Sequence, residues 1–232
     1  MNFLRIIRIL LTIVRLRLDR NIPKEFRKGN IAALLWILRR LPEPKSTGPE
    51  SARLALEELG PVFIKFGQIL STRKDLFSNE MSKELQKLQD QVPPFSAEVA
   101  IKIIENEIKG TIPSLFTSFD SIPLASASLA QVHAASMPVG AVEKEVVVKV
   151  IRPGIRKVIE RDIKLMYFFA NLLEKFWPDA RRLHPTAIVK DYEAIILDEL
   201  DLKLEADNSR RLRENWSGSG KLFVPEVYES CS

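Results

Sequence analysis

The sequence predicts an α+β protein in which helices fill the N-terminal half and a small sheet follows, with long helices after it. Three observations support this fold class. Apolar residues recur at helical spacing through most of residues 51–110, short runs rich in β-branched and aromatic residues lie between 116 and 151, and long helical patterns return after 154. The chain has 232 residues, 46% hydrophobic and 28% charged, which is enough for a folded domain with an extension.

The positive charge is concentrated at the N-terminal end. Residues 1–48 carry eleven lysines and arginines against three acidic residues, a net charge of +8, whereas the whole chain carries +5. The rest of the chain therefore carries −3, which argues against a nucleic-acid-binding domain, where the basic stripe would lie on the folded module itself. The single cysteine, Cys231, excludes a disulfide framework or a zinc cluster and favours a reducing compartment.

The first twenty residues are apolar but interrupted by arginines. Arg5, Arg8 and Arg15 share one side of a helical wheel, and no run of about 20 mostly apolar residues exists that could span a bilayer. A secretory signal is not indicated, because Arg8 interrupts the apolar region and no small-residue cleavage site follows. We expect a helix that lies in a membrane interface. The alternative is a helix docked on its own domain with its arginines in solvent.

A second apolar patch, in residues 30–42, contains Trp36 and ends at Pro42 and Pro44. The PEPKSTGPE that follows is typical of a linker. We therefore predict three segments: basic apolar helices at a membrane surface over 1–48, a helical extension over 49–115, and a sheet-containing domain over 116–232.

Glycine and proline separate the helical patterns of the extension. One helix ends at Gly60, the next begins at Pro61 and covers residues 62–74, and an amphipathic one ends before Pro93. A further helix begins at residue 96 and stops at Gly110.

The sheet is predicted from residue 116 onward. EVVVKVIRP, residues 145–153, is the clearest strand, and a turn-like PVGAVEK precedes it. Helical patterns then cover residues 154–177 and 185–215, and LFVPEVY, residues 222–228, has the pattern of another strand.

Lys149 is the one charged residue among the valines of that strand. A buried ammonium needs a charged or hydrogen-bonding partner, so a partner is one interpretation. An edge strand with Lys149 facing water is the other, and the alternation of Val146, Val148 and Val150 against Lys149 permits it.

The small-residue stretch LASASLAQVH lies just before this strand. Alanine and serine let a ligand approach a backbone closely, although glycine does so better. Gln131 and His133 are candidate ligands, but a lone histidine near a strand is more often a structural residue.

Three acids, Glu199, Asp201 and Glu205, lie in ILDELDLKLEADN. On a continuous helix Asp201 and Glu205 share a face, and Glu199 lies opposite, so the two faces could serve two different lysines. The alternative is an ordinary charged helix with a Glu199–Lys203 pair. A strand lysine, a preceding small-residue loop and a later helix glutamate occur in the order of a kinase N-lobe, where the glutamate positions the lysine that grips phosphates.

Five stretches together resemble the UbiB family of atypical protein-kinase-like proteins: GPVFIKFGQILSTRKDLF, PLASASLAQVHAA, VVVKVIRPGI, DELDLKLEADN and VPEVY. The likeness runs from about residue 50 to the end. It implies a protein-kinase-like N-lobe, with a small antiparallel sheet and helices, preceded by a helical extension that carries the K-x-G-Q motif. It also implies that the intact protein binds ATP with magnesium and acts as a kinase or ATPase in bacterial ubiquinone biosynthesis.

The resemblance also implies roles for individual residues. Lys149 would grip phosphate and Glu205 would orient it. An alanine-rich loop would replace the kinase glycine-rich loop, and the K-x-G-Q helix would fold over the nucleotide pocket, held through the E-x-D acids. These two sets are Ala125, Ser126, Ala127 and Ser128 for the loop, and Lys65, Gly67, Gln68, Glu199 and Asp201 for the two motifs.

The chain departs from the family in one respect. No H-x-D-x-x-x-x-N run and no D-F-G or D-x-G after the last predicted strand occur, so no catalytic residue and no metal ligand can be assigned. We expect a chain cut before the C-lobe, which binds ATP but turns over little on its own. Expected partners are nucleotide, an anionic membrane surface on the cytoplasmic side of the bacterial inner membrane, and proteins or lipids of ubiquinone biosynthesis, but no nucleic acid. The alternatives are a non-catalytic membrane-bound scaffold or pseudokinase remnant, and a soluble helical adaptor without a nucleotide site.

Overall fold

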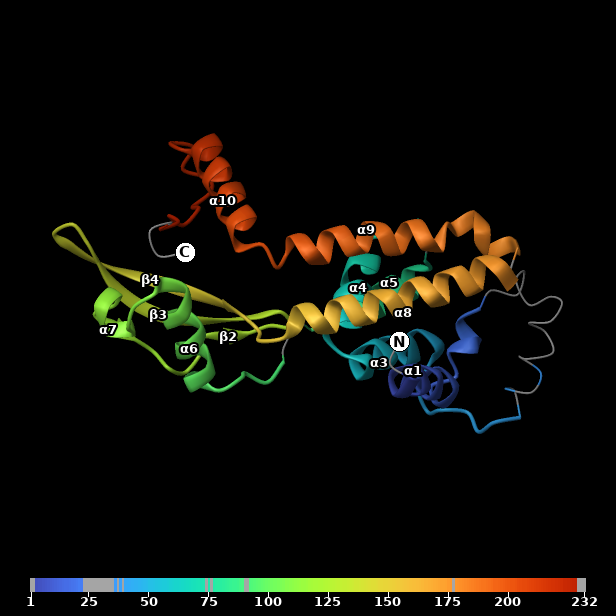
Figure 1. Ribbon diagram of the computed structural model, residues 1–232. Coiled ribbons are helices and arrows are strands. Elements are labelled where there is room, and N and C mark those ends of the chain that lie inside the picture. Colours follow the sequence, from blue (N-terminus) through green and yellow to red (C-terminus); the bar gives the residue numbers. More distant parts are fainter. Residues whose placement is uncertain are drawn as a thin grey trace. The chain divides into compact units, whose positions relative to one another are not determined.

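The computed structural model of the chain describes residues 3–22, 36, 38, 40–73, 75, 77–89, 92–176 and 178–228. The chain forms two compact units, each built from two separated stretches. The first unit comprises residues 1–90 and 157–193, and the second comprises residues 91–156 and 194–232 (Figure 1). The boundaries of these two units differ from the boundaries of the three segments predicted from the sequence. Most of helix α8 (Ile155–Phe176) and the first part of α9 (Pro185–Asp198) group with the N-terminal helices.

The first unit is helical where it is described. Its other elements are α1 (Phe3–Arg15), the 3₁₀ turn η1 (Leu18–Asn21), α3 (Gly48–Leu59), α4 (Pro61–Ser71), α5 (Asn79–Leu85) and the 3₁₀ turn η3 (Pro178–Leu183).

Local sequence signals explain how α3 and α4 begin and end. The Thr47 hydroxyl accepts a bond from the Glu50 amide, and the Glu50 carboxylate accepts one from the Thr47 amide, each at 3.3 Å, which forms a capping box at the start of α3. Gly60 has a φ of 92°, and Pro61 follows at the first position of α4. The Gly-Pro pair therefore ends one helix and starts the next without a loop, as the sequence predicts.

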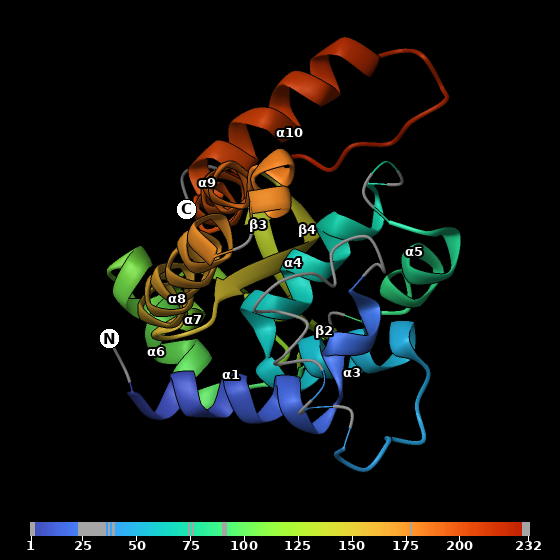
Figure 2. The ribbon, with the colours of Figure 1, turned by 90° about the vertical axis from the view of Figure 1, so that its right-hand side faces the viewer.

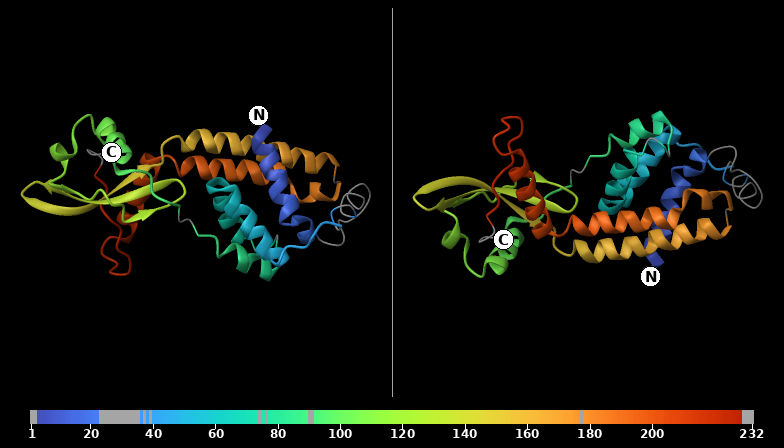
Figure 3. Two further views of the ribbon diagram at one scale, coloured as in Figure 1. Left: turned by 90° about the horizontal axis from the view of Figure 1, so that it is seen from below. Right: turned by 90° about the horizontal axis from the view of Figure 1, so that it is seen from above.

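Buried side chains join these helices to α8 and α9. Ile64, Leu85 and Leu88 form a small core between α4 and the α5 region. Tyr192 of α9 is fully buried, its hydroxyl donates to the Val62 carbonyl, and its ring lies 5.0 Å from that of Phe66. Helices α8 and α9 lie side by side in the two views of Figure 3, and the Tyr167 hydroxyl donates to the Glu193 carboxylate at 2.8 Å.

Helix α1 docks on this unit through its arginine side. The guanidinium of Arg5 is mostly buried and lies 2.6 Å from the Asp162 carboxylate. The helix is thus docked on its own unit, as the alternative interpretation expected, but that interpretation is wrong in placing Arg5 in solvent, because its partner Asp162 lies about 160 residues away in sequence. The expected membrane interface stays a prediction. Among the described helices, none is both long and apolar enough to cross a bilayer.

The second unit contains a four-stranded antiparallel sheet. The long strand β3 pairs along its whole length with β4, and with two short strands at its other edge. The strands are β1 (Ser118–Phe119), β2 (Ala125–Ser126), β3 (Ala130–Val139) and β4 (Val142–Ile151). The strand predicted at residues 145–153 is thus β4, in which Lys149 lies opposite Val132 and Val150 lies opposite Gln131.

Helices cover the sheet differently on its two sides. On one side α6 (Ala97–Ile108) and α7 (Ile112–Leu115) pack against the buried Ala135, Met137 and Val150. On the other lies α10 (Leu202–Trp216) (Figure 1). Residues alternate between the faces of a strand, so Lys149 points away from the core that contains Val150. This mixture of helices and a small antiparallel sheet is the fold class that the sequence predicts for a kinase-like N-lobe.

Two predicted elements differ in the structure. The helix expected over 185–215 is two helices, because α9 ends at Asp198 and α10 begins at Leu202. Residues 222–228 form no strand in the described region, and Pro225 lacks the amide that a ladder would need. The predicted helix over 30–42 lies mostly outside the described residues, as does Cys231.

Candidate nucleotide-binding site

An ion pair between β4 and α10 lies at the centre of the candidate site. The ammonium of Lys149 lies 2.6 Å from Oε2 of Glu205. Both side chains remain partly exposed, at 35% and 49%, so this pair contributes little to stability but fixes the direction of a flexible side chain. Both sequence interpretations of Lys149 are partly right, since the residue has a partner and also reaches solvent.

The surface around Lys149 is apolar and made of small side chains. Val132 lies opposite Lys149 in the register, and Ala134 lies opposite Val147 on the same face of the sheet. Val147 is 63% exposed, although valine is usually buried in a sheet. A cation beside a flat apolar surface suits a ligand that has a planar ring and an anionic group.

The alanine-rich stretch forms a tight hairpin rather than an open loop. Ser126 pairs with Gln131, and the Ala127 amide donates to the Ala130 carbonyl at 2.8 Å, so Ser128 and Leu129 alone form the turn. Both turn residues are buried. Ala125, Ser126, Ala127 and Ser128 therefore occupy the edge of the sheet whose strand β4 carries Lys149, and the tip of their hairpin is anchored in the unit.

Arg152, at the end of β4, fastens this hairpin and was missed by sequence reasoning. Its Nη2 donates to the Pro93 carbonyl, the Ser126 hydroxyl and the Ala127 carbonyl, at 3.1, 3.2 and 3.3 Å. Burial lowers the pKa of the Arg152 guanidinium from its usual range. The sequence signal that could have identified Arg152 was its position in VIRP, immediately after the predicted strand.

Gln131 and His133 are structural residues of the buried face. The Gln131 amide donates to Nε2 of His133 at 2.9 Å, which leaves Nδ1 of His133 to donate to the Asp120 carbonyl at 2.9 Å. The Gln131 carbonyl oxygen accepts from the Phe95 amide at 3.2 Å, and both side chains are fully buried. They are not available to a ligand, which confirms the structural interpretation.

The E-x-D acids lie at the break between α9 and α10. Oδ1 of Asp201 accepts from the amides of Lys203 and Leu204, at 3.0 Å each, so Asp201 caps α10. The prediction of one continuous helix through Glu199 and Glu205 is therefore wrong, and their service to two different lysines stays a prediction. The half-buried Glu199 lies in this break.

The K-x-G-Q residues belong to α4, in the other unit, and Gly67 and Gln68 serve packing there. A Cβ atom on Gly67 would lie 2.4 Å from Leu88 and 2.6 Å from Leu56, so only glycine fits without displacing both leucines. Nε2 of Gln68 donates to the Leu88 carbonyl at 3.1 Å, which holds the segment after α5. Lys65 is half-buried on α4, and its predicted pairing with Glu199 and Asp201 stays a prediction.

The described residues offer an oriented cation but no cluster of metal ligands. Within them, no group of three histidine, cysteine, aspartate or glutamate side chains could hold a metal, and Glu205 is engaged by Lys149. A phosphate group, by contrast, would find the Lys149 ammonium already oriented and partly exposed.

Comparison with known proteins places this geometry in a family. The ABC1 atypical kinase-like domain matches residues 87–232, which contain the whole sheet, the hairpin and the Lys149–Glu205 pair. Relatives named probable protein kinase UbiB match nearly the whole chain. That of Marinobacter nauticus is 49% identical over 225 residues, which cover 96% of this chain and 41% of the relative.

Other relatives agree. The probable protein kinase UbiB of Aliivibrio salmonicida is 52% identical over 206 residues, covering 89% of this chain and 36% of its own length. That of Azotobacter vinelandii is 47% identical over 229 residues, covering 97% and 42%. The chain thus spans about two fifths of the length of these relatives. It belongs to the ABC1 atypical kinase-like family, and the relatives that it matches are named UbiB proteins.

Proposed function

We propose that this chain forms the nucleotide-binding N-terminal part of a UbiB-type atypical kinase or ATPase that supports ubiquinone biosynthesis. Family membership supports the class of protein. The nucleotide role rests on one observation, the Lys149–Glu205 ion pair on the face of the sheet opposite the α6 core.

In this proposal Lys149 binds phosphate oxygens and Glu205 keeps its side chain extended. A free lysine loses up to about 2 kcal/mol of rotamer entropy when it is fixed, and the pair has already fixed it. The base of the nucleotide lies against Val132, Ala134 and Val147, and the hairpin at Ala125–Ser128 covers the phosphates. ATP supplies the transferable phosphoryl group, as in other kinase-like proteins.

The 232 residues contain no catalytic-loop or metal-binding motif of the kinase type, so we expect nucleotide binding without sustained phosphate release. We expect the catalytic and metal-binding residues of the relatives in the part of their sequences that this chain does not match. We further propose that the protein acts at the cytoplasmic face of a bacterial inner membrane, on or beside lipids or proteins of ubiquinone biosynthesis.

Titration with a non-hydrolysable ATP analogue, with and without magnesium, tests the nucleotide role. Lys149→Met is expected to weaken binding at least about tenfold, because it removes the cation that faces phosphate. Lys144→Met is the matched control. Lys144 lies on the same strand, is 40% exposed, and pairs with Glu226 at 3.0 Å, much as Lys149 pairs with Glu205.

Equal affinities of wild type and Lys149→Met would overturn this role, and so would an equal loss in Lys144→Met. If the wild-type chain binds no nucleotide at all, the non-catalytic scaffold becomes the better description of these 232 residues.

A further inference from the structure

Helix α1 is held by its polar side. The Arg5 guanidinium bonds Asp162 through two nitrogens, at 2.6 and 3.2 Å, and its Nη2 also donates to the Leu59 carbonyl at 2.6 Å. The Thr12 hydroxyl, only 1% exposed, donates to the Glu58 carboxylate at 2.9 Å. These contacts fix both the position and the rotation of α1 on its unit.

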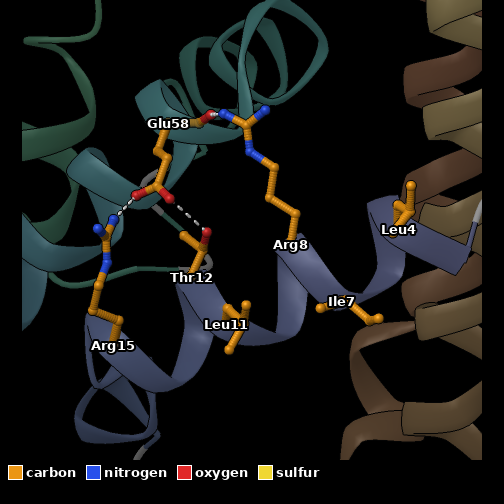
Figure 4. Close-up of a pocket in the computed structure, with 7 residues that line it drawn as sticks. All are labelled: Leu4, Ile7, Arg8, Leu11, Thr12, Arg15 and Glu58. Carbon is orange, nitrogen blue, oxygen red and sulfur yellow. Dashed lines mark hydrogen bonds and ion pairs between the residues drawn. The ribbon is translucent and has the colours of Figure 1, made fainter.

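Two further arginines of α1 converge on the end of α3. Nη2 of Arg8 donates to the Glu58 carbonyl at 2.8 Å, and Arg15 forms an ion pair with the Glu58 carboxylate. Figure 4 shows both guanidinium groups and Thr12 gathered around Glu58. Both arginine side chains are nevertheless exposed to solvent.

The apolar side of α1 faces outward, the reverse of an ordinary surface helix. Leu4 and Leu11 are 75% and 63% exposed. The exposed apolar residues recur every three or four positions and so form one stripe along the helix: Phe3, Leu4, Ile7, Leu10, Leu11 and Val14. Figure 2 shows α1 at the edge of its unit, with α3 beside it.

A shallow hollow of about 400 Å³ runs along one flank of this stripe. Its walls have two kinds of chemistry. Leu4, Ile7 and Leu11 provide an apolar side. Arg8, Arg15, Thr12 and Glu58 provide a polar side, on which two guanidinium groups outnumber one carboxylate (Figure 4). An acyl chain beside a phosphate headgroup has the same arrangement.

The size of the stripe favours a lipid surface over a protein partner. A helix of 13 residues is about 20 Å long and presents an apolar strip about 10 Å wide, hence roughly 200 Å². A stable protein interface buries about 800 Å² on each partner. The charge agrees, since residues 1–48 carry a net +8.

We propose that α1 is a lipid-binding surface helix that the fold holds with its apolar stripe outward. The stripe enters the acyl region of an anionic bilayer without crossing it, and Arg8 and Arg15 lie at the level of the lipid phosphates. The proposal rests on the membrane location proposed above and names the surface that makes the contact, but it is independent of nucleotide binding, since every residue that carries it lies in the first unit.

Flotation of the 232-residue chain with vesicles tests it, using phosphatidylcholine alone and phosphatidylcholine with phosphatidylglycerol, at low and high salt. Wild type is expected to float with anionic vesicles, and less so at high salt. The double variant Leu4→Ser/Leu11→Ser is expected to bind at least about tenfold more weakly. The matched control is Ile122→Ser/Leu124→Ser in the other unit, where Ile122 is 74% exposed and Leu124 is 63% exposed. This control should float like wild type.

Three outcomes would overturn the proposal. The first is a wild-type chain that binds no vesicle, and the second is a Leu4/Leu11 variant that floats as well as wild type. The third is sedimentation of wild type as a dimer that the Leu4/Leu11 variant turns into a monomer, which would assign the stripe to a second copy of the chain. Circular dichroism of the variants separates these results from a loss of folding.

Discussion

The ammonium of Lys149 meets the carboxylate of Glu205 at 2.6 Å, although 56 residues separate them in sequence. One lies on a strand and the other in the first turn of α10, a helix whose start is fixed by the Asp201 cap. The cap therefore determines the position of Glu205 relative to the strand. In this unit, the E-x-D segment thus has the structural role of starting α10.

Exchanging the two charges separates an ion pair from a phosphate-binding residue. In Lys149→Glu/Glu205→Lys the pair can form again, so the free energy of unfolding should stay within about 1 kcal/mol of wild type. Nucleotide affinity should fall at least about tenfold, because the strand then presents an anion to the phosphates. Urea unfolding and ATP-analogue titration measure the two quantities. Wild-type affinity in the exchanged protein would contradict the assigned role of Lys149.

Arg5 is expected to matter more to stability than its neighbour on the same helix. Arg5→Ala should lower the free energy of unfolding by about 3 kcal/mol, because among the described residues it leaves the buried Asp162 carboxylate with Arg161 as its charged partner. Arg8→Ala, at an exposed position that bonds one carbonyl, should cost less than about 1 kcal/mol. Urea unfolding followed by circular dichroism compares them, and equal costs would show that the Asp162 pair does not fix α1.

Gly67 should tolerate no branched side chain. Gly67→Val would force Leu56 and Leu88 to move inside a packed region, at a cost of about 3 kcal/mol. Ala194→Val, at an exposed position of α9, provides the control for the intrinsic effect of valine on a helix, which is below about 1 kcal/mol. Thermal denaturation measures both, and a Gly67→Val midpoint equal to the control would count against the packing role.

Acid should weaken the contact between α3 and α5 through Glu84. Hydrogen bonds from Lys87 and then Arg53 hold the pKa of Glu84 below its ordinary 4.5. A carboxylate with a lowered pKa in the folded state contributes stability at pH values above 4.5, and that stability is lost as the pH falls through the lowered value. Glu84→Gln should therefore cost about 1 kcal/mol at pH 7 and show a shallower loss of stability below pH 4.5.

Melting temperatures of wild type and Glu84→Gln from pH 7 down to pH 3 test this dependence. Glu80→Gln is a suitable control, because Glu80 is an exposed acid in the first turn of the same helix. Parallel curves for wild type and Glu84→Gln would contradict the assignment.

Local signals predicted the parts of the fold that depend on neighbouring residues. Gly60 and Pro61 marked the junction of α3 and α4, and the valine run marked β4. The order of Lys149 and Glu205 indicated their pairing, which the structure contains. The role of Gly67, in contrast, depends on leucines from two other segments, and spacing alone does not reveal such contacts.

The errors arise where a partner distant in sequence decides the outcome. The wheel of α1 identified an arginine side and an apolar side, but only Asp162 and Glu58 determine which side docks. The periodicity of residues 185–215 continues through the break at Glu199, because hydrophobic spacing carries no information about a cap. Asp201 was the available signal, since aspartate is favoured immediately before a helix.

The burial of the tip of the alanine-rich hairpin limits how this hairpin can move. A glycine-rich flap over phosphates can open because its tip is solvated and its backbone is permissive. Here Ser128 and Leu129 are buried, and Arg152 donates hydrogen bonds to Ser126 and Ala127, so the tip is part of the core of its unit. If the hairpin covers phosphates as proposed, it is expected to open only when the packing around its tip loosens first.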